Sequence, residues 1–343
     1  MNEVAPRTAY AAAGVDVAEG DRAVDLLRER LAGGSPDLLG GLGGFAAALP
    51  LPAGLREPVL VTATDGVGTK TEIARLLGRY DTIGRDVVAM CADDVVCHAA
   101  RPAWFLDYLA VGRLDAERAA EIVKGIADAC AEIGCRLVGG ETAEHPGVMA
   151  ADTFDLAGFC VGFVERDALL DGRTARAGDA VVGLASSGLH ANGYSLVRRL
   201  LADGRLTLDD ELLEPTRLYA TDLLALLDHA PTAGWRVCGL AHVTGGGLAG
   251  NLPRAMSRDL GVHLRPDAWP EPAIFGRLAT ASGMGGAEMR ATFNCGVGMA
   301  VVVERDAARE VVDFFLRRGI EAWHIGEIRP VDELGGQRYV EAG

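Results

Sequence analysis

The chain has 343 residues, of which 49% are hydrophobic and 24% are charged, a composition typical of a globular protein. At about 150 residues per domain, this length predicts two domains. The formal net charge of −15 argues against a nucleic-acid-binding surface. A phosphorylated ligand would therefore need local devices: backbone N–H groups, a few Lys or Arg side chains, and a divalent metal.

The cysteines and the termini predict the cellular environment. There are seven cysteines, an odd number, and no C-x-x-C spacing, which favours reduced, buried thiols over a disulfide framework. The N-terminus has no basic segment followed by an apolar core, and no apolar run reaches the length of a membrane span. We therefore expect a soluble cytoplasmic protein with no membrane partner.

The first half of the chain alternates strand and helix patterns. Apolar residues at helical or alternating spacing predict these elements: a helix over 21–31, a strand from 59, helices over 69–80 and 82–100, a strand over 104–111, a helix over 115–133, and strands over 135–138 and 154–164. Residues 167–178 are polar and rich in turn formers. They mark the expected domain boundary.

The second half has the same character. Its expected strands cover 180–185, 237–243, 261–265 and 298–303, with closing strands near Trp323 and Tyr339. Its expected helices cover 195–202, 215–229, 271–280 and 306–318. Because both halves mix strands and helices, the fold class is α/β (of the α+β type), with one domain over residues 1–168 and a second over 169–343.

Glycine is the exception in the composition. The chain holds 45 glycines, about twice the usual share of roughly 7%, and they cluster in loops, which suggests backbone contacts to a ligand. The densest cluster is Gly40, Gly41, Gly43 and Gly44. Such a loop is expected to move when empty and to close over a phosphate chain.

Residues 59–70 contain the first chemical motif. An apolar run predicts a buried strand, which leads into Asp65, Gly66, Gly68, Thr69 and Lys70. The two glycines allow a tight turn that presents N–H groups to an anion. The carboxylate at a strand end suits a metal, and the lysine suits a phosphate. The plain alternative is a strand, a glycine turn and a helix cap at Thr69.

Three carboxylates occur at the ends or edges of separate elements in the first half. They are Asp65, Asp94 and Glu141, the last of which follows Gly139 and Gly140 after a short strand. If they converge, they suit one or two Mg²⁺ ions that bind the phosphates of a nucleotide. The alternative is that each is a solvated cap or loop acid.

The second half has a histidine in a strand-to-helix loop. His190 lies between Gly188 and Asn192 and is a candidate acid/base or substrate-orienting group. A lone histidine in a loop is more often structural, and nothing local decides between the two roles.

Two nucleotide-binding patterns are incomplete. Gly245-x-Gly247-x-x-Gly250 formally fits a dinucleotide fingerprint, but Pro253 interrupts the helix that should follow. Residues 66–71 end in Lys-Thr, yet their spacing is too short for a P-loop. An ATP enzyme of this sequence would not be of the P-loop kind.

Taken together, the motifs resemble those of a known family. They are GGLGGF at 40–45, DGVGTK at 65–70, GGETAE at 139–144, SSGLHANGYSLVR at 186–198, PTR at 215–217, HVTGGG at 242–247 and FNCGVGM at 293–299. In this order they resemble the phosphoribosylformylglycinamidine cyclo-ligases, also called aminoimidazole ribonucleotide synthetases. The resemblance covers nearly the whole chain.

The resemblance implies a ligase of de novo purine biosynthesis. Its reaction is an ATP- and Mg²⁺-dependent ring closure of formylglycinamidine ribonucleotide to aminoimidazole ribonucleotide, with release of ADP and phosphate. It also implies a homodimer whose N-terminal sheets join into a barrel, with a C-terminal α/β domain beside it. Residues 1–168 would then form the ATP- and Mg²⁺-binding and dimerisation domain.

The resemblance also implies roles for residues. Lys70 would stabilise charge on the transferred group, while His190 and Asn192 would orient the amidine or formyl group. The cofactor-binding residues would be Gly40, Gly41, Gly43, Gly44, Asp65, Gly66, Gly68, Thr69, Gly139 and Gly140. The metal ligands would be Asp65, Asp94 and Glu141. The ribose phosphate would lie against Thr244, Gly245, Gly246 and Gly247. One departure is Asp93, where the family commonly has Asn; it predicts one extra negative charge at the metal.

Other ATP enzymes share this architecture. Selenophosphate synthetases need a reactive residue near the N-terminus, but the first cysteine here is Cys91. The hydrogenase maturation proteins need a C-terminal cysteine, and this chain ends Glu341-Ala342-Gly343. Thiamine monophosphate kinases lack the motif at 186–198. A non-catalytic nucleotide-binding regulator would keep the glycine loops and release no phosphate.

Overall fold

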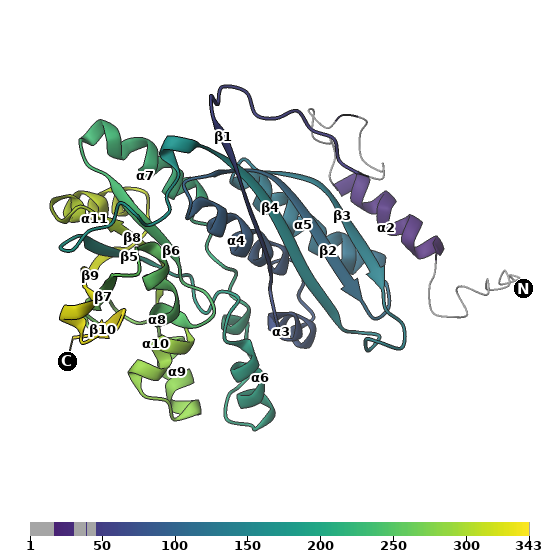
Figure 1. The fold of residues 1–343 in the computed structure, drawn as a ribbon. Helices are drawn as coiled ribbons and strands as arrows, with labels where there is room; N and C mark the ends of the chain where they lie inside the picture. The colour runs from purple at the N-terminus through teal and green to yellow at the C-terminus, as the bar shows by residue number, and fades with distance from the viewer. Residues whose placement is uncertain (1–16, 31–38, 40–45, 343) are drawn as a thin grey trace, which may run out of the picture.

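Two β-sheets organise the chain (Figure 1). The structure is a computed structural model that describes residues 17–30, 39 and 46–342. The N-terminal sheet has the strand order β1-β4-β2-β3, and the C-terminal sheet has the order β10-β7-β9-β5-β8-β6. Both halves combine strands with helices, so the predicted mixed α/β class with two domains is confirmed.

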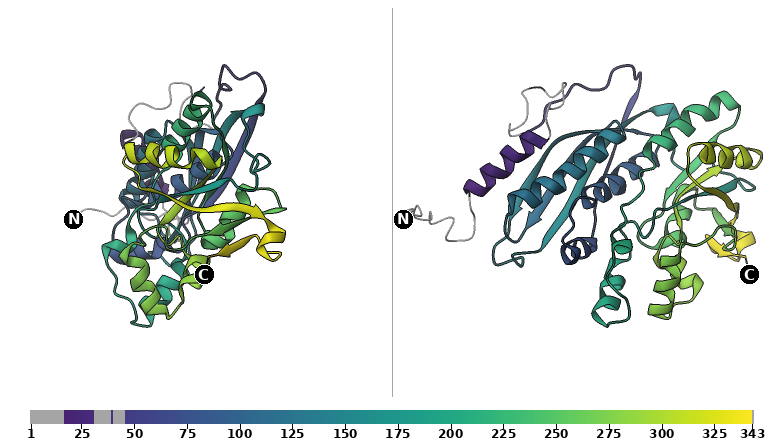
Figure 2. Two further views of the ribbon diagram at one scale, coloured as in Figure 1. Left: turned by 90° about the vertical axis from the view of Figure 1, so that its left-hand side faces the viewer. Right: turned by 180° about the vertical axis from the view of Figure 1, so that it is seen from behind.

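The N-terminal sheet is covered on one face. Its strands are β1 (Pro58–Gly66), β2 (Arg101–Val111), β3 (Arg136–Glu144) and β4 (Phe154–Glu165). Its helices are α2 (Val17–Arg30), α3 (Lys70–Leu77), α4 (Ile83–Val96) and α5 (Ala116–Glu132). Helix α4 packs on β1, β2 and β4, α5 packs on α4 and β3, and α2 packs on α5. Seen from behind, these helices lie in front of the sheet (Figure 2).

The opposite face of this sheet is open and partly apolar. Leu60, Tyr108 and Phe159 are 55%, 37% and 48% exposed, while Val59 and Val61 pack against the core beneath the helices. Successive side chains of a strand point to opposite faces, so β1 alternates between exposed and half-buried positions along its length. The prediction of a fully buried strand here is wrong, because β1 is an edge strand of a sheet with one open face.

The C-terminal sheet includes strands β5, β6 and β8, which are buried on both faces. Its strands are β5 (Ala180–Ala185), β6 (Val237–His242), β7 (Leu260–Leu264), β8 (Val297–Val303), β9 (Ala322–Pro330) and β10 (Tyr339–Glu341). Its helices are α6 (Tyr194–Ala202), α7 (Ala220–Ala233), α8 (Gly247–Asn251), α9 (Ala273–Ser282), α10 (Gly286–Thr292) and α11 (Ala308–Arg317). Alternate residues of β8 contribute to two separate core clusters, for example Val301 to one and Val302 to the other. This is why β5, β6 and β8 read as near-continuous apolar runs.

Short 3-10 turns connect several of these elements. They are η1 (Arg166–Ala168), η2 (Asp210–Leu213), η3 (Leu252–Ala255), η4 (Arg305–Ala307) and η5 (Val331–Leu334). The turn η3 packs against β6 and β7, whereas α11 packs on β5 and β9. The two halves meet where α4 contacts α7 and β6.

Three sequence predictions need correction. Residues 139–141 were expected in a loop after a short strand, but they lie inside β3. The helix expected over 215–229 is α7, which starts only at Ala220, because the preceding segment bonds to carboxylates of α4 instead. Helix α10 was not predicted. Its seven residues are too few to show a clear period.

Two structural facts bear on the expected absence of a membrane span and on the expected reduced cysteines. No helix in the described part of the chain has both the length and the apolar character needed to cross a membrane. The seven cysteines are unpaired; Cys97 is half-buried and the other six are buried.

Candidate active site between the two sheets

A cavity of about 350 Å³ lies where the two halves meet. Its walls come from the free edge of β1, the C-terminal end of α4, the connection between the sheets, β6 and η3. The lining residues are Thr62, Ala63, Thr64, Asp94, Cys97, His98, Leu170, Asp171, Gly172, Gly239, Leu240, Ala241, His242, Asn251, Arg254 and Ala255. A cleft between domains with a few convergent polar groups is the usual form of a small-molecule site.

Asp94 and His242 form a pair across this junction. The Asp94 Oδ1 atom lies 3.0 Å from His242 Nδ1, and the histidine side chain is almost fully buried. Burial alone would lower the pKa of His242, but the hydrogen bond to Asp94 and the charges of Asp93, Asp94 and Asp65 together raise it. The second ring nitrogen, Nε2, is buried and has no hydrogen-bond partner among the described residues.

Asp65 belongs to the same electrostatic cluster. It lies near the end of β1, where its Oδ1 atom accepts a 2.7 Å hydrogen bond from the N–H of Gly66. Burial and the negative charge of Asp94 raise the pKa of the Asp65 carboxyl, although the Gly66 bond and His242 oppose the shift. Asp94 lines the cavity and Asp65 lies near the end of the strand beside it, and two carboxylates whose charges repel each other are a donor set that suits a divalent cation.

Glu141 is not part of that cluster within one chain. It pairs with Tyr108 in the register of β2 and β3, so both side chains lie on the open face of the sheet. Asp65 pairs with Gly158, where an added Cβ would meet Phe105, on the face that the helices cover. No group of three metal-ligating side chains forms among the described residues. The predicted convergence of three carboxylates therefore fails at Glu141.

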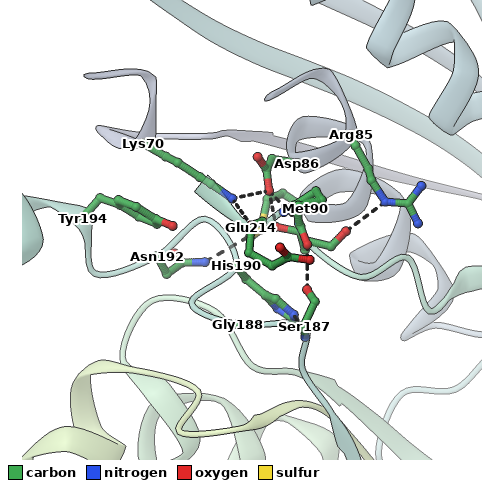
Figure 3. A network of polar contacts seen from close by, with 12 residues as sticks. Lys70, Arg85, Asp86, Met90, Ser187, Gly188, His190, Asn192, Tyr194 and Glu214 are labelled. Atoms are coloured by element: carbon green, nitrogen blue, oxygen red, sulfur yellow. Dashed lines mark hydrogen bonds and ion pairs between the residues drawn. The ribbon is translucent and has the colours of Figure 1, made fainter. Parts of the chain in front are cut away.

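Lys70 is buried rather than open to the cavity. Its amine donates to Asp86 Oδ1 at 2.8 Å and to the carbonyl oxygen of Glu214 at 2.7 Å, and its side chain has no exposed surface. In Figure 3 the amine points at these two acceptors, and it lies 5.7 Å from the centre of the Tyr194 ring. Burial lowers the pKa of Lys70, and Asp86 counteracts that shift. The direct contact with a transferred group that the resemblance implied is not available in this arrangement.

Asp86 extends this network into the second half of the chain. Its Oδ1 atom also accepts from the backbone N–H of Thr216 at 2.8 Å and from the Thr216 hydroxyl at 2.5 Å. Arg85 donates to the Thr216 carbonyl oxygen at 3.2 Å. These bonds hold residues 214–219 against α4 outside any helix, and α7 begins only at Ala220.

Asp93 points away from the expected metal site. Its oxygens accept from the N–H of Tyr219 at 3.1 and 3.3 Å, and its side chain is fully buried. Burial raises the pKa of Asp93 to about 7, although His242 and the Tyr219 bond act against the shift. The prediction of an extra charge facing the metal is wrong. On neighbouring positions of a helix, Asp93 faces the start of α7 while Asp94 faces the cavity.

His190 is a buried residue with an unusual backbone. Its φ of 62° lies in the left-handed region that non-glycine residues rarely adopt, and its Nε2 accepts from the N–H of Ser187 at 3.2 Å. The other nitrogen, Nδ1, has no partner among the described residues. Burial holds the pKa of His190 well below its ordinary value, so the ring is neutral and helps to shape its own loop.

Asn192 lies next to the glycine turn that follows β6. An added Cβ on Gly245 would lie 3.4 Å from Asn192 Oδ1, and Asn192 Nδ2 lies 3.8 Å from the sulfur of Met90 on α4 (Figure 3). Gly246 and Gly247 have φ angles of 88° and 59°, which non-glycine residues disfavour. The structure thus brings the loop of Asn192 and residues 244–247 together.

The remaining predicted cofactor residues divide into two groups. Gly66, Gly68, Thr69, Gly139 and Gly140 are described: Gly66 ends β1, Gly68 and Thr69 lie in the turn between β1 and α3, and the last two lie in β3. Gly40, Gly41, Gly43 and Gly44 lie outside the described residues.

Sequence reasoning missed three polar residues of the cavity. His242 was noticed only as part of a motif, and Asn251 and Arg254 were not considered. Asn251 donates to the carbonyl oxygens of Gly245 at 3.1 Å and Gly247 at 2.9 Å. The sequence did hold a signal for them. Asn251 and Arg254 are two polar residues that follow the glycine turn and are three positions apart, and this spacing places both side chains on one side of a helical turn.

Comparison with known proteins gives a consistent result. The family model for the N-terminal domain of AIR synthase related proteins matches residues 46–164, and the model for the C-terminal domain matches residues 176–338. A phosphoribosylformylglycinamidine cyclo-ligase of Sorangium cellulosum (strain So ce56) is 48% identical over 339 residues, covering 95% of this chain and 96% of the relative. The enzyme of the same name from Myxococcus xanthus (strain DK1622) is 46% identical, covering 94% and 96%.

Solved structures share the fold at lower identity. A thiamine-monophosphate kinase from Stenotrophomonas maltophilia K279a superimposes with a TM-score of 0.66 at 21% identity, covering 94% of this chain and 96% of its own. The hydrogenase maturation protein HypE in complex with ATP gives 0.68 at 19% identity, covering 94% and 91%. At this identity the likeness concerns the fold alone.

Proposed function

Since the chain belongs to the phosphoribosylformylglycinamidine cyclo-ligase family, we propose that its interdomain site closes the imidazole ring of aminoimidazole ribonucleotide. The substrates are ATP and formylglycinamidine ribonucleotide, and the products include ADP and phosphate. One observation supports this most directly: Asp94 of the first half pairs with His242 of the second half in a single cavity, which Asn251 also lines while it bonds to the glycine turn.

The chemistry explains why the site needs both the acidic residues of the first half and the glycine turn of the second half. An amide oxygen is a poor leaving group, so ATP first phosphorylates the formamide oxygen of the substrate. The amidine nitrogen then attacks the same carbon, and the C–O bond breaks with release of phosphate. The catalytic demand is mainly to position the two substrates and to stabilise charge on the transferred phosphoryl group.

The positions of the site residues support a role for each of them. Asp65 and Asp94 would hold Mg²⁺, which when bound offsets the charge of the triphosphate. Asn192 orients the reacting amide beside the glycine turn. The turn at residues 244–247 offers a phosphate the backbone N–H groups of Thr244, Gly245 and Gly246, since that of Gly247 already donates to the Thr244 carbonyl oxygen at 3.0 Å. Lys70 and His190 act from buried positions: they hold residues 214–216 and the loop at 187–190 in place.

The open face of the N-terminal sheet supports a homodimer. Leu60, Tyr108 and Phe159 are exposed there, and apolar patches of this kind commonly mark an interface. Packing two such faces together would bury them and would give the barrel that the resemblance implies. It would also place Glu141 at the interface. The division at residue 168 and a cytoplasmic location belong to the same proposal.

A single assay tests the function. Purified protein is incubated with ATP and Mg²⁺, with and without formylglycinamidine ribonucleotide, and ADP and aminoimidazole ribonucleotide are quantified. We expect equal amounts of both products, formed only when the ribonucleotide is present. ADP formation that does not depend on this substrate, or that depends on thiamine monophosphate instead, would contradict the proposal.

A further inference from the structure

The interdomain cavity has one strong cation. Of the residues that line it in the described part of the chain, Arg254 is the only lysine or arginine. The acids of the lining are Asp94, which bonds to His242 at 3.0 Å, and Asp171, which forms an ion pair with Arg173 at 3.0 Å. Arg254 itself makes no ion pair with a described residue, and its side chain is exposed.

Arg254 is held by a buried amide. Its Nη1 atom donates to Asn251 Oδ1 at 3.0 Å, and Asn251 is only 2% exposed. The Asn251 Nδ2 atom is in turn bonded to the carbonyl oxygens of Gly245 and Gly247. A single buried side chain thus joins the guanidinium to the glycine turn and fixes one relative to the other.

We infer that Arg254 binds the phosphate monoester of the substrate and that Asn251 is its positioning residue. This inference rests on the proposed function and adds the recognition of one substrate group. A guanidinium with several free N–H groups forms paired hydrogen bonds with phosphate oxygens. The adjoining glycine turn can supply further backbone donors.

The charge distribution supports this assignment. The amine of Lys70, the other expected cation, already donates hydrogen bonds to Asp86 and Glu214. The whole chain carries a net charge of −15, so a dianionic substrate needs a local cation. Because Asp94 and Arg254 both line the cavity, a phosphate near Asp94 would be repelled and one near Arg254 attracted. The substrate is thereby oriented with its reacting end toward the acids.

The test compares two substrates in two enzymes. Formylglycinamidine ribonucleotide and its dephosphorylated nucleoside are each assayed with the parent chain and with Arg254→Gln. A hydrogen-bonded charge pair of this kind corresponds to roughly a ten- to hundredfold change in affinity. We expect the KM for the ribonucleotide to rise by that factor in the variant, with the KM for ATP unchanged. The nucleoside, which lacks the phosphate, should react equally slowly with both enzymes.

Two further variants sharpen the result. Arg254→Lys keeps the charge and should recover part of the affinity for the ribonucleotide. Arg258→Gln removes an exposed arginine that is not among the lining residues, and it should leave all constants unchanged.

The outcomes separate the two proposals. An Arg254→Gln enzyme that loses the same factor on the ribonucleotide and the nucleoside, or that loses nothing, would refute the phosphate assignment while the ring-closing function stands. If the parent chain forms no ADP in response to the ribonucleotide, both proposals are overturned.

Discussion

Replacing Asp93 by asparagine should stabilise the protein, and the gain should grow with pH. The carboxyl is fully buried at the start of α7, and burial raises its pKa from 3.8 to about 7. A carboxyl whose pKa is raised by folding favours the folded state only while it is protonated. Its contribution is therefore lost as the pH rises from 3.8 toward and beyond the folded-state value. Asp93→Asn keeps an oxygen for the Tyr219 N–H and stays neutral at every pH.

The magnitude follows from the shift. A rise of about three pKa units corresponds to about 4 kcal/mol when both states are fully ionised. At pH 5 most of this cost is still absent, and between pH 5 and pH 8 it grows by about 2 to 3 kcal/mol. With roughly 2 °C per kcal/mol in a chain of this size, the variant should gain ~5 °C in Tm between these pH values.

The assay is the difference in Tm between parent and variant across this pH range. The difference is needed because Asp107, another buried carboxyl, has its pKa raised to about 7 by burial and adds its own pH dependence to both proteins. Asp128→Asn is the control, since Asp128 is exposed and paired with Lys124 on the surface, where such pairs contribute little. A Tm difference for Asp93→Asn that is constant from pH 5 to pH 8, or negative at pH 8, would refute the reasoning.

Three other outcomes follow from the structure. Lys70→Met should lower the free energy of unfolding by about 3–5 kcal/mol, because it leaves Asp86 buried without a countercharge. Combining it with Asp86→Leu should restore part of the loss, and a Lys70→Met protein as stable as the parent in urea would contradict this reasoning. Asp94→Asn should lower ADP formation sharply, with part of the activity recovered in a magnesium titration; equal activity at low magnesium would remove Asp94 from the metal site. Phe159→Glu should shift the mass measured by light scattering from two chains to one, because a carboxylate would replace an exposed apolar side chain on the open sheet face. A parent protein that is already monomeric at micromolar concentration would rule out the dimer.

The elements of the fold were largely predictable from sequence. Strands such as β5 and β8 are short apolar runs between turn signals, and α11 carries a clear helical period. The edges of elements were less predictable. Helix α7 starts five residues later than expected because Thr216 and Tyr219 bond to acids more than a hundred residues earlier in the chain. No local pattern reports such a contact.

The candidate site was predictable by residue type and less so by geometry. Asp65 and Asp94 were identified, and the structure places them in one electrostatic cluster. Glu141 was assigned to the same site. The face of the sheet on which its side chain lies depends on the register between β2 and β3, because a shift of one residue moves the side chain to the other face. Lys70 and His190 were expected to face the ligand. The burial of Lys70 arises from packing between the two halves, and that of His190 arises from contacts within the second half. Sequence spacing encodes neither.

The three aspartates of α4 have a consequence for dividing the chain. Asp86, Asp93 and Asp94 all belong to the first half, and each bonds to a residue of the second half. A fragment that ends at residue 168 would present these acids to solvent without their partners. Residues 214–219 would likewise lose the bonds that hold them against α4. Chimeras between family members should therefore inherit α4 and residues 214–219 from the same parent, even when the crossover lies in the connection between the sheets.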